Sequence, residues 1–142
     1  MRDDSVFFTY ETVKKPWGGA NTFLKSLYEE LTNYYNLDLQ PYKKRKDKAK
    51  LVFLNQLSKG PLNKSSYLNR KEIDLIRSNS DNIVVRAVNL FSNSSYRISL
   101  RKPFLYFRQD QLSIYLANIA DHVIFQSEFQ KEIFVKKGYF GI

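Results

Sequence analysis

Short apolar segments that alternate with helix-like segments constrain the fold of this 142-residue chain more than any other feature. Runs of aliphatic, aromatic and β-branched residues are typical of buried strands, and they lie at residues 6–10, 37–39, 51–54, 83–85 and 122–125. Between them, apolar residues recur at spacings of three and four, which predicts helices over residues 20–35, 70–78 and 110–120, with a last helix after residue 127. This alternation predicts an α/β fold, Rossmann-like, with three α/β/α layers around a mostly parallel sheet.

Local signals mark the ends of several elements. Asp110 and Ser127 are good N-caps, so they predict where the last two helices begin. Gly138 is expected to end the last helix. Asp81 and Asn82 predict a turn before the 83–85 strand, and residues 89–108 predict a long polar and aromatic connection.

Composition limits the class of protein. A hydrophobic content of 43% suits one domain with a real core and argues against disorder. The chain has no cysteine and one histidine, so no disulfide and no metal site is predicted. No apolar run reaches the roughly 18 residues of a membrane span, and residues 1–8 do not resemble a signal peptide, so we expect a cytoplasmic protein. The net charge of +9 attracts phosphates of nucleic acids, anionic lipids or nucleotide sugars alike.

Ligands of open α/β sheets bind at the carboxyl ends of the strands, where the sequence places loops 11–20, 86–109 and 126–128. In the first loop, Gly18 and Gly19 precede a helix whose free N–H groups can hold a phosphate, although a tight turn without a ligand explains them equally well. These glycines do not form the fingerprint of a nicotinamide-binding fold. Asn21 follows and can orient an acceptor or the loop itself.

The other two loops hold further candidates. Arg86 and Asn89 follow the 83–85 strand and can hold a phosphate or a sugar hydroxyl; the alternative for Arg86 is a structural pairing with Asp110 or Asp121. Ser127 can line the same edge or simply cap its helix.

Arg108 ends a segment, residues 91–108, in which basic and aromatic residues are interleaved. Such a segment can stack on sugars, bind single-stranded nucleic acid, rest peripherally on an anionic membrane, or fold back over the sheet.

Three segments together carry a family resemblance. They are Lys15–Leu24, a double-glycine turn that opens a helix; Ile83–Asn89, a strand that ends in Arg-x-x-Asn; and Ala120–Lys131, a strand-to-helix junction. In this order they resemble the amino-terminal domain of family 4 glycosyltransferases, which have the GT-B fold. The resemblance covers residues 6–140.

The resemblance implies one half of a GT-B architecture, in which two Rossmann-like domains face each other across a cleft. The whole enzyme would transfer a hexose from a nucleotide sugar, its co-substrate, to a hydroxyl of a glycan, a lipid or another acceptor, with no cofactor. Gly18 and Gly19 would contact the donor diphosphate, and the acceptor side of the cleft would be lined by Asn21, Arg86, Asn89, Arg108 and Ser127.

No catalytic residue is indicated in this half, because retaining members are thought to use the phosphate of the donor as the base. Residues 1–142 are expected to form this single domain, with the carboxy-terminal donor domain absent from the chain or supplied as a partner. Two alternatives stay open at this point: a basic α/β module that binds nucleic acid, and a truncated domain without catalytic function.

Overall fold

The computed structural model describes residues 5–10, 12–14, 19–34, 36–38, 48–60, 67–90 and 103–141. Its elements follow one another as β1 (Ser5–Phe8), α1 (Gly19–Leu31), β2 (Asn36–Asp38), β3 (Ala49–Asn55), α2 (Arg70–Ser78), β4 (Ser80–Ala87), α4 (Pro103–Ile119), β5 (His122–Phe125) and α5 (Glu128–Lys136). This order confirms the predicted alternation of strands and helices.

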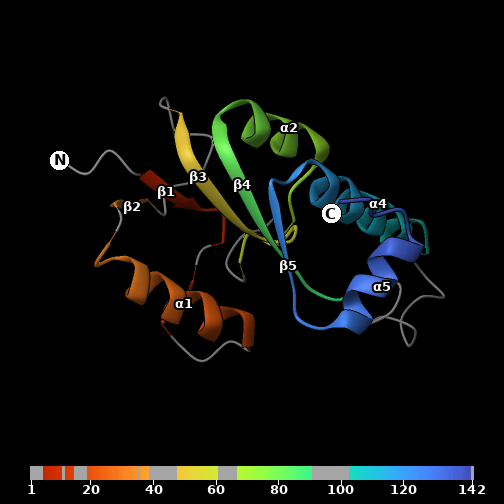
Figure 1. Ribbon diagram of the computed structural model, residues 1–142, viewed down its shortest axis with the longest axis horizontal. Coiled ribbons are helices and arrows are strands. Elements are labelled where there is room, and N and C mark those ends of the chain that lie inside the picture. Colours follow the sequence, from red (N-terminus) through yellow and green to blue (C-terminus); the bar gives the residue numbers. More distant parts are fainter. Residues whose placement is uncertain are drawn as a thin grey trace.

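The five strands form one sheet in the order β2-β1-β3-β4-β5, and every neighbouring pair is parallel (Figure 1). The chain moves from β1 to β2 on one side and then returns to place β3 on the other side of β1. Because crossovers between parallel strands are right-handed, this reversal puts α1 on one face of the sheet and α2 and α4 on the other. The three-layer α/β/α prediction is therefore confirmed.

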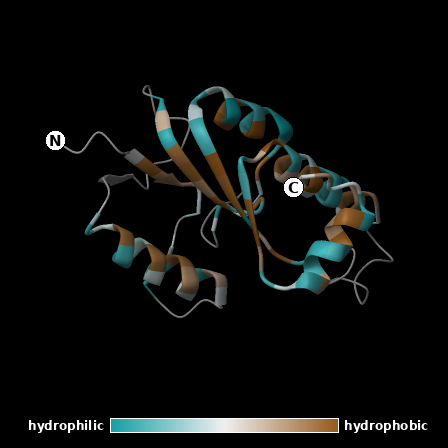
Figure 2. Ribbon diagram, viewed as in Figure 1, coloured by the Kyte–Doolittle hydropathy of each residue, from teal (hydrophilic) through white to brown (hydrophobic). Residues whose placement is uncertain are grey.

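Successive strand residues point to opposite faces, so each strand supplies two cores. On the face covered by α2 and α4, Val52, Leu54 and Val85 are fully buried. On the α1 face, Phe8 and Phe53 pack with Leu24 of α1. The apolar colouring of the central strands in Figure 2 reflects this burial on both sides.

Helix α5 extends the layer formed by α4. Phe134 of α5 packs on the ring of Phe125 of β5, with 5.3 Å between the ring centroids, and joins Ile114 of α4 in one cluster. Ser127 caps α5 as predicted, because its hydroxyl accepts a hydrogen bond from the Gln130 amide at 3.2 Å. Gly138, with φ of 112°, ends the helix.

Two local predictions are wrong. Asp110 does not cap a helix but lies buried inside α4, which already begins at Pro103, where a proline without an N–H is well tolerated. Asp81 and Asn82 do not form a turn, since β4 begins at Ser80 and pairs with β3 from there. Strand pairing has overridden their turn preference, and both side chains are exposed at the amino end of the sheet.

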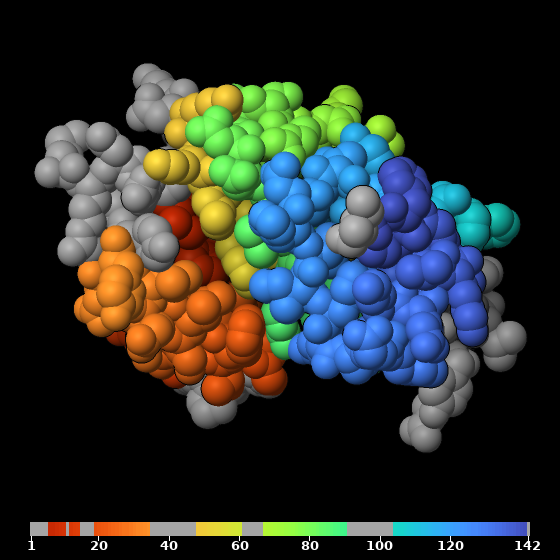
Figure 3. Space-filling view, viewed as in Figure 1, coloured from red at the N-terminus to blue at the C-terminus, as the bar shows by residue number. Residues whose placement is uncertain are grey.

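The α1 face of the sheet is covered only in part. Ile124 of β5 points to this face and is 48% exposed. Figure 3 shows side chains of β3 and β4 at the floor of a furrow between α1 and β5. Within the described ranges, no helix combines the length and apolar character needed to cross a bilayer.

Candidate functional site

A hollow of about 340 Å³ opens where β3, β4 and β5 end. Its lining is Asn55, Gln56, Leu57, Ser58, Tyr67, Val88, Asn89 and Gln126. Its place at the carboxyl ends of parallel strands and its volume are those of a small-molecule site. The lining contains amides, a hydroxyl and a tyrosine but no charged side chain, so it suits a neutral ligand rich in hydroxyl groups.

The segment after β3 contributes half of this lining, and the sequence-based prediction did not include it among the candidate loops. Gln56 holds that loop in place from a left-handed backbone conformation, with φ of 49°. Its side-chain oxygen accepts a hydrogen bond from the Val88 amide at 2.7 Å, and its amide nitrogen donates to the Ser113 hydroxyl at 2.9 Å. A polar pair, Asn55 and Gln56, directly after a buried apolar run was the signal available in the sequence.

Asn89 lies in the lining, as one of the predicted cleft residues. Its side-chain oxygen accepts a hydrogen bond from Gln130 Nε2 at 3.1 Å, and the side-chain oxygen of Gln130 accepts one from the Gln126 main-chain N–H at 3.1 Å. Gln130 is buried and also donates its main-chain N–H to Ser127. Asn89 and Ser127, 38 positions apart, thus belong to one network that shapes the edge of the hollow.

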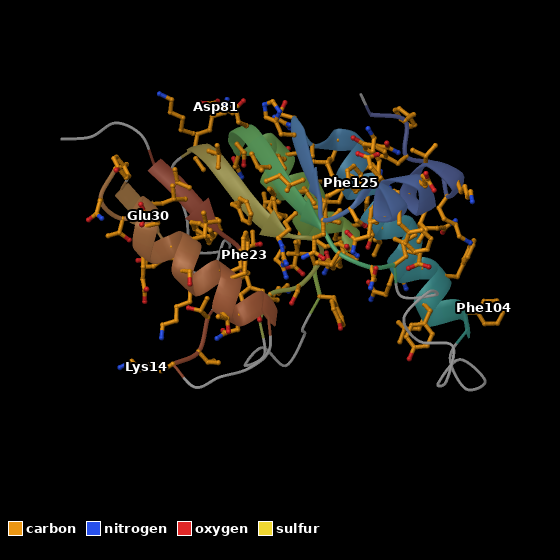
Figure 4. The ribbon with its side chains drawn as sticks, turned by 60° about the horizontal axis from the view of Figure 1, so that its bottom comes forward. Lys14, Phe23, Glu30, Asp81, Phe104 and Phe125 are labelled. Atoms are coloured by element: carbon orange, nitrogen blue, oxygen red, sulfur yellow. The ribbon has the colours of Figure 1, made fainter. Side chains whose placement is uncertain are left out.

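Arg86 lies directly behind the hollow. Its Nη1 donates to Asn55 Oδ1 at 2.8 Å, and its guanidinium carbon lies 4.4 Å from the ring centroid of Phe23 in α1. Figure 4 shows Phe23 on the side of α1 that faces the sheet. Asp121, one of the partners predicted for Arg86, is bound by Arg77 and the Ile83 amide instead. Burial lowers the pKa of Arg86 from its ordinary value.

The loop before α1 is held by Asn21. Its side-chain oxygen accepts from the Val13 amide at 2.8 Å while its amide nitrogen donates to the Val13 carbonyl at 3.0 Å, so this buried side chain orients the loop. Gly19 begins α1, and a Cβ at this position would meet nothing within 4 Å. Gly18 lies outside the described residues.

Arg108 does not line the hollow. It is exposed in the second turn of α4, near Phe104 and Phe107, which are 86% and 61% exposed. Phe104 points away from the body of the molecule in Figure 4. Residues 91–102, which supply most of the predicted basic and aromatic segment, lie outside the described residues.

Two buried side-chain oxygens have no hydrogen-bond partner among the described residues, Thr9 Oγ1 and Gln109 Oε1. Thr9 directly follows β1. The main-chain carbonyl of Gln109 accepts a hydrogen bond from the hydroxyl of Ser113, which is the partner of Gln56. Both therefore belong to the carboxyl end of the sheet, where such atoms commonly meet a ligand or ordered water.

No model of a known protein family matches this chain, and neither does any curated protein or solved structure. The site must be interpreted from its own chemistry. Across the described ranges, no group of three histidine, aspartate or glutamate side chains is placed to hold a metal ion. What the geometry offers is a neutral, hydrogen-bonding hollow backed by one buried arginine.

Proposed function

We propose that this chain is the acceptor-side domain of a GT-B glycosyltransferase, which would hold a hydroxyl-rich acceptor while a second domain presents the nucleotide sugar. The observation that carries the proposal is the neutral hollow at the carboxyl ends of β3, β4 and β5. Side-chain amides both donate and accept hydrogen bonds, as sugar hydroxyls do, and Tyr67 adds a ring for the apolar face of a sugar.

The start of α1 takes the donor side in this proposal. Gly18 and Gly19 precede or begin a helix of 13 residues, and open space in front of Gly19 leaves room for a diphosphate. Arg86 connects the two sides, since it contacts Phe23 of α1 as well as Asn55 in the wall of the hollow. The reaction itself would need no nucleophile from this domain.

Sugar binding tests the proposal directly. In ¹⁵N NMR titrations with neutral mono- and disaccharides, we expect the amides of Gln56, Val88 and Asn89 to shift. Tyr67→Leu should weaken this binding about five- to thirtyfold, because an aromatic face against a ligand contributes on the order of 1–2 kcal/mol.

Tyr34→Leu is the matched control. Tyr34 is also an exposed tyrosine, but it follows the carboxyl end of α1 and therefore lies at the amino end of the sheet. Its substitution should leave sugar affinity unchanged. If no neutral saccharide shifts the amide signals of the residues that line the hollow, or if salt-sensitive binding to polynucleotide occurs there instead, the glycosyltransferase proposal fails.

We also propose that the first turns of α4 contact an anionic membrane, which would present a lipid-linked or membrane-bound acceptor. The exposed rings of Phe104 and Phe107 beside Arg108 favour this role.

A further inference from the structure

Arg86 is the least exposed of the described arginines, at 9% of its surface. It lies on β4 opposite Ile124 of β5, with its side chain on the α1 face of the sheet. Phe23 of α1 covers the guanidinium from one side, and both Phe23 and Ile124 remain partly exposed. The guanidinium therefore lies on the α1 face of the sheet, between Phe23 and the position opposite Ile124, and next to Asn55 of the hollow.

The positive charge of Arg86 has no counter-charge among the described residues. Two arginines that are more exposed than Arg86 each have a carboxylate partner. Arg70 pairs with Asp74 at 3.3 Å, and Arg77 pairs with Asp121 at 3.0 Å. Arg86 instead has the neutral oxygen of Asn55 and the face of an aromatic ring. A buried charge without an opposite charge is costly, whereas exposed charges are stabilised by water.

The arrangement leaves most of the guanidinium's hydrogen-bonding capacity available. Of its five N–H donors, one is directed at a side chain of the described residues, that of Asn55, and the guanidinium carbon lies over the ring of Phe23. A guanidinium edge matches the two oxygens of a phosphate or carboxylate group. The bond to Asn55 and the contact with Phe23 restrict the guanidinium, so little side-chain freedom is lost on binding.

We infer that Arg86 is the binding residue for an anionic group, a phosphate or carboxylate, carried by the acceptor sugar. Asn55 contacts Arg86 and also lines the hollow, so one ligand can place its hydroxyl-rich ring in the hollow and its anionic group on Arg86. This inference rests on the proposed function, which it narrows from sugars in general to acidic or phosphorylated sugars.

Calorimetric titrations of the whole chain with four probes test it: glucose, glucose 6-phosphate, inorganic phosphate and uridine diphosphate. Glucose 6-phosphate should bind at least tenfold more tightly than glucose, since charge-assisted hydrogen bonds are about twice as strong as neutral ones. Arg86→Gln should abolish this preference. Arg86→Lys keeps the charge but loses the planar edge, so it should retain only part of the preference.

Arg77→Gln is the matched control, because Arg77 is paired with Asp121 at the amino end of the sheet and should not affect the preference. Equal binding of glucose and glucose 6-phosphate by the unaltered chain overturns the inference without requiring any variant to fold. Binding of uridine diphosphate alone also overturns it, because the anion would then belong to the donor. Arg86-dependent phosphate binding without any sugar binding supports the anion site while contradicting the proposed function.

Discussion

At the scale of single residues, the backbone of Gln56 adopts a left-handed conformation that its hydrogen bonds hold in place. Gln56→Ala should lower the free energy of unfolding by about 2–4 kcal/mol, since the partly buried Val88 N–H and the buried Ser113 hydroxyl would each lose a partner. Gln56→Gly loses the same side chain, but glycine adopts positive φ freely, so this variant should be about 1 kcal/mol more stable than the alanine variant. Urea unfolding of both variants measures the difference.

The alanine and glycine variants control for each other, because they differ by one methyl group at the same site. A glycine variant less stable than the alanine variant would mean that the backbone of residue 56 is not strained in the folded protein. The effect of neither substitution could be predicted from the sequence alone. A left-handed conformation at a glutamine has no signal in the residue type, which adopts it rarely.

At the scale of elements, the first turns of α4 expose apolar side chains in several directions. Phe104, Leu105 and Phe107 are all exposed and are separated by about 100° per residue around the helix. A protein groove covers one side of a helix, whereas lipid can surround its end. We therefore expect the chain to sediment with vesicles containing phosphatidylglycerol. The double variant Phe104→Ser, Phe107→Ser should bind these vesicles at least about tenfold more weakly, because its two serine side chains, unlike the phenyl rings they replace, gain nothing by leaving water.

Phe140→Ser provides the control for α4. Phe140 is 79% exposed, comparable with Phe104, but its amide donates to Asn118 Oδ1 near the opposite end of α4, about 21 Å from Phe104 along the helix. Its loss should leave vesicle binding unchanged. Equal binding by the double variant and the unaltered chain would exclude this end of α4 as the lipid contact.

Elements were more predictable than the site. The apolar runs define the strands, since burial of β3 and β4 on both faces leaves continuous apolar sequences. Helix α4 was predicted seven residues too late, because its first turns face solvent with apolar residues and lack the amphipathic pattern. The hollow depends on which loops meet in space, and Tyr67, which reaches it through the β-bridge of Ser58, has no sequence neighbour that indicates this.

At the scale of the whole molecule, we expect residues at the amino end of the sheet to contribute to stability and residues at the carboxyl end to bind the ligand. At the amino end of the sheet, Asp121 Oδ2 accepts hydrogen bonds from the Ile83 amide at 2.7 Å and from Arg77 at 3.0 Å, which connects α2, β4 and the start of β5. Burial acts to raise the pKa of Asp121, but these hydrogen bonds and the charge of Arg77 outweigh it and hold the pKa below its ordinary value of 3.8. The ionised carboxylate therefore stabilises the fold.

Asp121→Asn tests this separation. At pH 7 the variant should lose about 1 kcal/mol of unfolding free energy, because hydrogen bonds to a charged, half-exposed carboxylate become bonds to a neutral amide. The contribution of a carboxylate with a lowered pKa is complete above the pKa of the unfolded chain and disappears as pH falls through the folded-state pKa. The unaltered chain and the variant should thus begin to converge in stability as pH falls below about 4, as measured by urea unfolding at pH 7, 5 and 3. Sugar binding at pH 7 should be the same in both.

A stability difference that does not change with pH would show that the charge of Asp121 contributes nothing. A folded variant that no longer binds sugar would show that the two ends of the sheet are coupled.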